Sequence, residues 1–395
     1  MKSLLITEVF PPKTGGSGRW FWEIYRRLPR EEVVVAAGED PRHEEFDRTH
    51  DLNVVRMPLT FSTWGIASVR GLRNYWQSAK KLARLARAER VDAVHCGKCL
   101  PEGLLAWWLR RRHGIPYLVY VHGEELNLAS LSRELNWLTR RVLHGAMFVI
   151  ANSRNTERLL KEQWGLASDR VQLFYPGVDT DRFRPARRDA DVRASLGWHG
   201  RPVVLTVGRL QKRKGHDQMI LALRPIREAI PTVLYAIVGD GEERTNLDQL
   251  VAREKMADHV QFRGELDDAD LIRCYQQCDL FVLPNRQVGG DIEGFGMVLL
   301  EAQACGRAVA AGASGGTAET MSIPQTGLVV SCDGPAEVAS LVIDLLSDHT
   351  RRDGMGNAAR EWVVSRFDWT VLSQRAACLF NTANSGAEHA AWAPA

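Results

Sequence analysis

Short runs of aliphatic and β-branched residues alternate with amphipathic segments along the whole chain, and this alternation restricts the fold more than any other feature. Segments such as 18–28, with apolar residues four positions apart, predict helices. The runs between them in the first half predict strands, at residues 3–7, 33–36, 93–95, 117–121 and 147–151. Strands that alternate with helices favour a parallel sheet with helices on both faces.

A turn-rich stretch, Pro176-Gly177-Val178-Asp179, interrupts this alternation near the middle of the chain. The alternation then restarts, with strands predicted at 203–207, 233–238, 260–262, 280–283 and 308–311. A chain of 395 residues is long enough for two domains. We therefore expect an α/β protein with two doubly wound, Rossmann-like domains, residues 1–177 and 178–368, facing each other across a cleft. A last helix at about 369–384 is expected to pack back on the first domain.

Composition excludes several classes of protein. Hydrophobic residues make up 45% and charged residues 25%, as is ordinary for a globular chain, and the formal charge of +3 does not suggest a nucleic-acid partner. No stretch approaches the roughly 18 apolar residues of a membrane span, and the N-terminal run is too short for a signal peptide, so we expect a cytoplasmic protein. Cys96 and Cys99 lack the second pair of a zinc site, so we expect buried, reduced thiols and no bound metal.

Because ligands bind at the carboxyl ends of strands in such sheets, the turns that follow strands are the places to search for chemistry. The first such turn holds Gly15, Gly16 and Gly18. Glycines let backbone N–H groups approach an anion, and the helix that follows adds its positive end. A phosphate cradle and a plain tight turn both remain open here.

The second turn is strongly basic. Four cations stand in the six positions 209–214, directly after a predicted strand: Arg209, Lys212, Arg213 and Lys214. These cations repel one another unless an anion lies among them. Arginine forks and lysine point charges suit a diphosphate, although a solvated surface loop is the alternative.

The third turn combines carboxylates with glycines. Glu293 precedes Gly294 and Gly296, which can bring backbone amides close to a ligand, and a helix is predicted from about Met297. Glu301 stands inside that helix among apolar residues, where a carboxylate is costly unless it is paired. Hydroxyl groups of a ribose are a suitable partner. His122, after the predicted strand 117–121, is a weaker candidate on its own.

Together these residues resemble the retaining glycosyltransferases of family 4, which have the GT-B fold. The resemblance is carried by the spacing from Glu293 to Glu301, by the Ala302-Gln303-Ala304-Cys305-Gly306 run, by Ser314-Gly315-Gly316 with Glu319, and by the Val207-Gly208-Arg209 and Lys214-Gly215 elements. It covers about residues 1–370. The stretch 289–319 looks most like the bacterial phosphatidylinositol mannosyltransferases.

The resemblance implies roles for individual residues. Arg209 and Lys214 would bind the diphosphate of a GDP- or UDP-sugar donor, and Glu301 would hold its ribose. Glu293 would contact the transferred hexose, with backbone amides from Gly294, Phe295, Gly296 and Met297. His122 would lie beside the reacting carbon and Gly16 near the phosphates. The cations would replace a metal in stabilising the leaving group, so we expect neither metal nor cofactor. Asp179 and Asp181 form a D-x-D, which we interpret as part of a turn.

The acceptor is expected to be a glycan or a lipid-linked molecule. Between residues 66 and 113, Lys and Arg number 11 and Asp and Glu number 3, a balance of 11 − 3 = +8. Within this span Leu72, Trp76, Ala79, Ala83 and Ala86 fit one helical face, and Arg73, Lys80, Arg84 and Arg87 fit another. Basic amphipathic helices bind anionic lipid, which suggests a peripheral protein at the inner face of the cytoplasmic membrane. A helix that packs on its sheet with a solvated basic face is the alternative.

Other functions remain open from the residues alone. A nucleotide-sugar epimerase of the same fold would bind the same donor. A dinucleotide-dependent dehydrogenase would need the G-x-G-x-x-G pattern, which neither half carries after its first strand. A non-catalytic polyanion-binding protein would use the basic region but gives no reason for the Glu293–Glu301 spacing.

Overall fold

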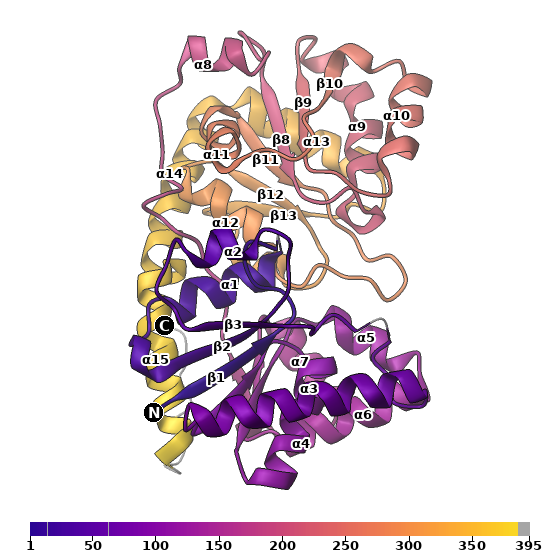
Figure 1. Ribbon diagram of the computed structural model, residues 1–395. Coiled ribbons are helices and arrows are strands. Elements are labelled where there is room, and N and C mark those ends of the chain that lie inside the picture. The colour runs from indigo at the N-terminus through magenta and orange to yellow at the C-terminus, as the bar shows by residue number, and fades with distance from the viewer. Residues whose placement is uncertain (14, 62, 386–395) are drawn as a thin grey trace. The chain divides into compact units, whose positions relative to one another are not determined.

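The computed structural model describes residues 1–13, 15–61 and 63–385, which form two compact units. Unit 1 comprises Met1–Pro176 together with the segment from Trp369 onward, and unit 2 comprises Gly177–Asp368. Each unit contains one sheet in which every pair of neighbouring strands is parallel (Figure 1).

Unit 1 contains a seven-stranded sheet in the order β3-β2-β1-β4-β5-β6-β7. Its strands are β1 (Ser3–Thr7), β2 (Val33–Gly38), β3 (Val54–Met57), β4 (Ala93–Cys96), β5 (Tyr117–Val121), β6 (Val149–Ala151) and β7 (Val171–Leu173). Its helices are α1 (Gly16–Tyr25), α2 (His43–Asp47), α3 (Val69–Ala88), α4 (Leu104–His113), α5 (Glu124–Ser130), α6 (Arg133–Gly145), α7 (Arg154–Glu162) and α15 (Trp369–Ser385).

Unit 2 contains a six-stranded sheet in the order β10-β9-β8-β11-β12-β13. Its strands are β8 (Val203–Val207), β9 (Leu234–Val238), β10 (Val260–Phe262), β11 (Leu280–Leu283), β12 (Val309–Gly312) and β13 (Gly327–Val330). Its helices are α8 (Ala190–Ser195), α9 (His216–Ala229), α10 (Arg244–Arg253), α11 (Asp268–Gln277), α12 (Met297–Ala304), α13 (Pro335–Ser347) and α14 (His349–Phe367).

The central strands are buried along their whole length, as expected for parallel sheets covered on both faces. Every residue of β1, β2, β5, β8 and β9 is buried. Burying one Val or Leu side chain contributes about 1.5–3 kcal/mol, so these strands are the main source of each unit's stability. They also give the loops at their carboxyl ends a rigid base.

The sequence prediction missed three strands, β3, β7 and β13, each of which lies at an edge of its sheet. Their residues are partly exposed, so their apolar signal is weak. The predicted helix 18–28 begins and ends earlier, at Gly16 and Tyr25.

The last helix, α15, belongs to unit 1, where it contacts α1 (Figure 1). The Phe380 ring centroid lies 6.0 Å from that of Tyr25 and 4.5 Å from that of His95, and Trp369 is fully buried. In the part of the chain that the structure describes, no helix combines the length and apolar character required to cross a bilayer. Six of the seven cysteines are buried free thiols, and Cys378 is exposed.

Candidate active site

The fold of unit 2 places two loops at one switch point. The chain leaves β8 for β9 and β10 on one side and later returns to β11 on the other side of β8. In an open parallel sheet, ligands bind outside the carboxyl ends of the strands where the strand order reverses in this way. The loop 208–215 follows β8, and the loop 284–296 follows β11.

The loop after β8 needs glycine where it approaches the loop after β11. Gly215 has φ 73°, and a Cβ there would lie 1.7 Å from the backbone oxygen of Pro284. Gly215 directly precedes α9, and His216, the first residue of that helix, holds the loop through a hydrogen bond. The Nε2–H of His216 donates to the backbone oxygen of Arg209 over 3.3 Å. Burial lowers the pKa of His216 to about 4, so this side chain is neutral.

Three of the four cations of this loop have carboxylate partners within unit 2. Lys214 Nζ lies 2.6 Å and Arg213 Nη1 2.5 Å from Glu293 Oε2. Lys212 Nζ lies 2.9 Å from Asp217 Oδ2 and 4.0 Å from Glu243 Oε2. The expectation that these cations repel one another without a bound anion is therefore wrong, because carboxylates from elsewhere in the unit balance them.

Arg209 differs from its neighbours. Its side chain is exposed and makes no hydrogen bond or ion pair to any residue that the structure describes. Lys214 is buried to 8% exposure, and its ammonium carries three donors, of which Glu293 needs one. Arg209 and Lys214 can therefore both donate to an added anion without breaking a contact seen in the structure.

Glu293 is the central carboxylate of the site and is 8% exposed. Burial raises the pKa of Glu293, but the charges of Lys214 and Arg213 outweigh burial and hold it below its ordinary value. The backbone of Glu293 is fixed by the loop after β12. A Cβ at Gly315 would lie 1.6 Å from the backbone oxygen of Glu293, and Gly316 N–H donates to that oxygen over 3.1 Å.

Gly296 ends the loop and caps α12 with φ 96°. The first N–H groups of a helix have no partner inside it, so the backbone from Gly296 onward presents donors. The Phe295 side chain is 3% exposed, with its ring 6.1 Å from that of Phe367. Phe295 can therefore reach a ligand only through its backbone.

Glu301 lies inside α12 and is 7% exposed. Tyr275 Oη from α11 donates to Glu301 Oε2 over 2.7 Å. Burial, and then the charge of Glu301, raise the pKa of Tyr275, so the phenol stays a donor. The sequence predicted a partner for Glu301 but not this one, because nothing near Tyr275 in the sequence indicates the contact.

Of the remaining predicted residues, Gly16 and His122 lie in unit 1, and Asp179 lies at the start of unit 2. Gly16 begins α1, and His122 follows β5. The Nε2–H of His122 donates to the backbone oxygen of Gly97 over 2.8 Å, and its ring lies 5.7 Å from that of Trp20. Asp179, in the D-x-D, accepts the N–H of Arg182 over 3.0 Å and so caps a turn.

The sequence prediction placed Arg213 in the basic loop without a role of its own, and it did not find Arg286. Arg213 bridges Glu293 and Asp291, the latter over 3.1 Å. Arg286, after β11, makes a two-pronged ion pair with Asp217 at 2.8 and 2.7 Å. Its position at the end of a strand was the one available signal. No group of three or more His, Cys, Asp or Glu able to hold a metal occurs among the described residues.

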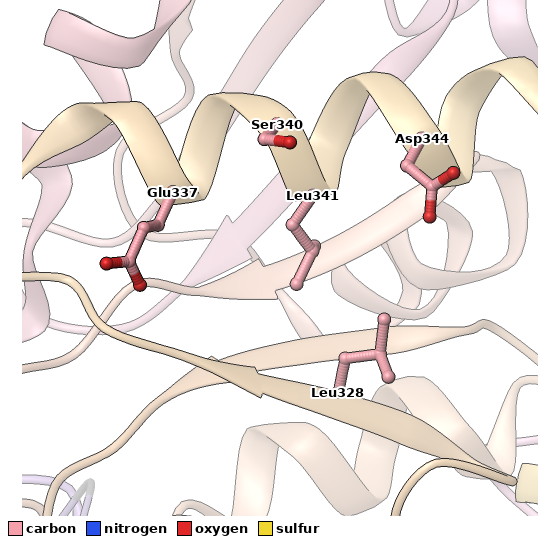
Figure 2. A pocket seen from close by; sticks show the side chains of 5 residues that line it. All are labelled: Leu328, Glu337, Ser340, Leu341 and Asp344. Carbon is pink, nitrogen blue, oxygen red and sulfur yellow. The ribbon is translucent and has the colours of Figure 1, made fainter.

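A cavity of about 420 Å³ lies elsewhere in unit 2, between β13 and α13 (Figure 2). Leu328 and Leu341 face each other there, between Glu337 and Asp344. No residue of the loops after β8 and β11 lines it, so it is separate from the candidate site.

Comparisons with known proteins agree with this geometry. Residues 189–362 match the family model "Glycosyl transferases group 1", and residues 14–182 match "Glycosyltransferase Family 4". A GDP-mannose-dependent alpha-(1-6)-phosphatidylinositol monomannoside mannosyltransferase of Mycolicibacterium smegmatis is 33% identical over 388 residues, covering 96% of this chain and 98% of the relative. The corresponding monoacylated-substrate enzyme of Corynebacterium glutamicum is 31% identical over 381 residues, covering 95% and 96%.

Among solved structures, HepE of Anabaena in complex with UDP superimposes with a TM-score of 0.82 at 21% identity, covering 97% of this chain and 100% of that chain. This likeness confirms the GT-B fold class predicted from the sequence. The epimerase, dehydrogenase and polyanion-binding alternatives are set aside, because the relatives are glycosyltransferases over nearly their full length. The chain belongs to glycosyltransferase family 4 and is a glycosyltransferase.

Proposed function

We propose that this enzyme transfers mannose from GDP-mannose to a lipid-linked acceptor of the phosphatidylinositol mannoside class. The observation that carries the proposal is the similarity to relatives whose names state this activity, at 31–34% identity over 95–96% of the chain. The basic loop 208–215 supports it, because its exposed Arg209 and its Lys214 suit a nucleoside diphosphate.

The proposed donor contacts follow from charge. Arg209 and Lys214 bind the diphosphate, where negative charge grows as the leaving group departs, and fixed cations there stabilise the transition state. Glu293 contacts the transferred sugar. Glu301, which accepts from Tyr275, also accepts a ribose hydroxyl, since a carboxylate can accept several hydrogen bonds.

We also propose transfer with retention and without a metal. The cations of the loop can do the electrostatic work of a metal ion at the diphosphate. Activity is therefore expected to survive EDTA, and an α-linked donor is expected to give an α-linked product. A strict requirement for manganese or a β-linked product would contradict this.

Transfer from radiolabelled GDP-mannose to phosphatidylinositol monomannoside in detergent micelles tests the main proposal. A thermal-shift screen against GDP, UDP and ADP identifies the base, since a ligand at 100 times its Kd stabilises by about 2.7 kcal/mol. GDP is expected to give the largest shift. Absence of lipid-linked product, or transfer only from a UDP-sugar, would overturn the proposal.

We further propose that unit 1 binds the inner face of the cytoplasmic membrane through α3 and the α5–α6 region. The α3 face assigned from the sequence divides in the structure: Ala79, Ala83 and Ala86 are buried, whereas Leu72 and Trp76 are 54% and 57% exposed. Leu128, Leu131 and Trp137 are also exposed, at 51%, 83% and 51%.

Leu72 and Trp76 form one exposed apolar group, and Leu128, Leu131 and Trp137 form the other. Hydrogen bonds from the segment before α3 to Glu134 of α6 connect the two regions. Glu134 Oε1 accepts the N–H of Ile66 over 2.5 Å and the N–H of Ala67 over 2.7 Å, just before α3. Cations accompany both groups: Lys80 Nζ lies 3.4 Å from the Trp76 ring centroid, and Arg141 Cζ lies 4.8 Å from that of Trp137. Exposed apolar side chains with cations beside them suit an anionic lipid surface.

Sedimentation with vesicles tests this surface. The protein is expected to pellet with phosphatidylglycerol vesicles at low salt, to be released at high salt, and to ignore neutral vesicles. Leu131→Ser combined with Trp76→Ser should reduce pelleting, and Ile323→Ser, which changes a 47% exposed residue of unit 2, should not. Equal failure on both lipids would contradict membrane binding.

A further inference from the structure

The switch point of unit 1 carries a charged cluster that the proposed donor contacts do not use. The chain passes from β1 to β2 and β3 on one side and returns to β4 on the other side of β1 (Figure 1). Glu8 directly follows β1, and Lys98 follows β4 by two residues. Both side chains therefore stand where an open parallel sheet binds its ligand.

These two side chains form an ion pair that solvent can still reach. Lys98 Nζ lies 2.5 Å from Glu8 Oε2, and the two side chains are 18% and 15% exposed. Lys13 Nζ lies 3.3 Å from Glu8 Oε1. Lys98 Nζ also lies 5.1 Å from the ring centroid of Trp64, which is half-buried.

Two buried carboxyl groups, those of Glu102 and Glu125, belong to the same cluster. Glu102 is 1% exposed, and its Oε1 accepts the N–H of Glu8 over 2.8 Å. Glu125 is 6% exposed, and its Oε1 accepts the N–H of His122 over 2.9 Å. In each, Oε2 is buried and has no partner among the described residues. A buried oxygen without a donor costs stability, and such groups concentrate at functional sites.

The charges of the cluster come close to balance. Burial lowers the pKa of Lys98, but Glu102, Glu8 and Glu125 outweigh burial, so the lysine stays an ammonium ion. An added anion would meet Glu8 beside each cation here, unlike the exposed Arg209 of unit 2. The cluster therefore suits a neutral ligand.

The groups on offer match a ring that carries hydroxyls. A carboxylate accepts from one hydroxyl, and an ammonium donates to its neighbour. The half-buried Trp64 adds a flat apolar surface for the C–H face of a ring. A sugar or cyclitol presents all three features within one molecule.

We propose that Glu8, Lys98 and Trp64 form the subsite for a neutral, hydroxyl-bearing ring of the acceptor. Glu102 is a positioning residue, because it holds the backbone of Glu8 and does not itself reach the ligand. That the ring belongs to the acceptor rests on the proposed transferase function, whereas binding of the ring does not.

Saturation-transfer NMR on the full chain with GDP present tests the subsite directly, with myo-inositol and methyl α-D-mannopyranoside as probes. The wild-type protein is expected to give a signal with at least one probe. Glu8→Gln and Lys98→Met are expected to weaken binding at least about 10-fold, since hydrogen bonds to charged groups are lost. Thermal unfolding of each variant checks that the fold is kept.

Lys2→Met is the matched control. Lys2 Nζ lies 2.5 Å from Glu89 Oε2, and the side chains are 28% and 27% exposed, so it is a similar pair in the same unit. Lys2 directly precedes β1, so it lies at the amino ends of the strands, away from the carboxyl ends where the subsite is proposed. This variant is expected to keep the NMR signal. No signal with the wild type, or equal binding by all variants, would overturn the subsite.

Transfer kinetics separate failure of the subsite from failure of the proposed function. Glu102→Ala is expected to raise the KM for phosphatidylinositol monomannoside about 10-fold with little change in the Kd of GDP, and Glu102→Gln is expected to restore it, because its amide oxygen can still accept from Glu8. Probe binding without any transfer would contradict the function and leave the subsite standing. Transfer with an unchanged acceptor KM in Glu8→Gln would overturn the subsite.

Discussion

The two sheets of this enzyme end in switch points of the same topology and of different charge. In unit 2 a single loop after β8 carries four cations, and the carboxylates that balance three of them come from other segments. In unit 1 the loops after β1 and β4 each supply one charge, and these two residues, Glu8 and Lys98, form an ion pair with each other. The fold thus determines where a ligand binds, and the residues after each strand determine which ligand it is.

The largest expected effect comes from removing the cation of unit 2 that is both buried and next to Glu293. Lys214→Ala is expected to lower turnover about 100-fold, because a fixed charge at the leaving diphosphate is lost in the transition state. Steady-state transfer assays measure it. Arg209→Ala should also lose at least about 10-fold.

Lys212→Ala is the control for that experiment, since Lys212 lies in the same loop but pairs with Asp217 and Glu243. It is expected to change turnover little. Near-wild-type activity of both Lys214→Ala and Arg209→Ala would remove the phosphate assignment and with it the contrast between the two switch points.

A second effect tests the buried carboxyl of unit 1. Burial raises the pKa of Glu102 from its ordinary value of 4.5 to about 7. The charge of Lys98 opposes this rise, and the charge of Glu8 adds to it. Between these two pH values the folded state keeps a proton that the unfolded chain has released, so the free energy of unfolding falls as pH rises.

Glu102→Gln removes this titration. Between pH 5 and pH 8 the variant is expected to gain about 2 kcal/mol of stability relative to the wild type, measured by urea unfolding at both pH values. A constant difference would show that Glu102 is ionised throughout, and the two switch points would then be more alike in charge.

A third effect separates the two carboxylates of unit 2. Glu301→Ala is expected to weaken GDP binding about 10-fold, whereas Glu293→Gln should reduce transfer more than binding. Calorimetric binding and transfer rates on both variants measure this. Tyr275→Phe, which keeps Glu301 and removes the hydroxyl group that donates to it, should have a smaller effect on binding. The reverse pattern for the two carboxylates would exchange or cancel their roles.

The smallest effect concerns Arg213, which we regard as a positioning residue. Loss of Arg213 leaves Glu293 with Lys214 alone, so the pKa of the buried carboxyl should rise. Arg213→Met is expected to move the acidic limb of the rate–pH profile upward by about one unit or less. Arg286→Met is the control, because Arg286 pairs with Asp217 instead. An unmoved limb in Arg213→Met would contradict the role.

The sequence predicted the central strands well and the edges poorly. β1, β5, β8 and β11 have the predicted bounds, because a continuous apolar run marks a strand buried on both faces. β10 also has its predicted bounds, although it is a partly exposed edge strand. β3, β7 and β13 were missed because an edge strand is short and half-exposed, and its few apolar residues resemble a loop.

The site shows the same limit in another form. Motifs within one loop, such as 208–215 and 293–301, could be found because their residues are neighbours in the sequence. The partners of their charges could not, because Arg213 and Glu293 are 80 residues apart and Lys98 and Glu8 are 90 apart. Only the strand order brings such residues together. The roles assigned to His122 and Gly16 stay predictions.

The return of the chain to unit 1 at Trp369 makes unit 2 an insertion whose two ends meet. Val178 N–H donates to the backbone oxygen of Phe367 over 2.9 Å, and Thr180 Oγ1 donates to Asp368 Oδ2 over 2.6 Å. The segment 177–368 can therefore be excised as one cassette with adjoining ends. On the ribosome, unit 2 has its whole sequence available before α15, with the buried Trp369, can complete unit 1.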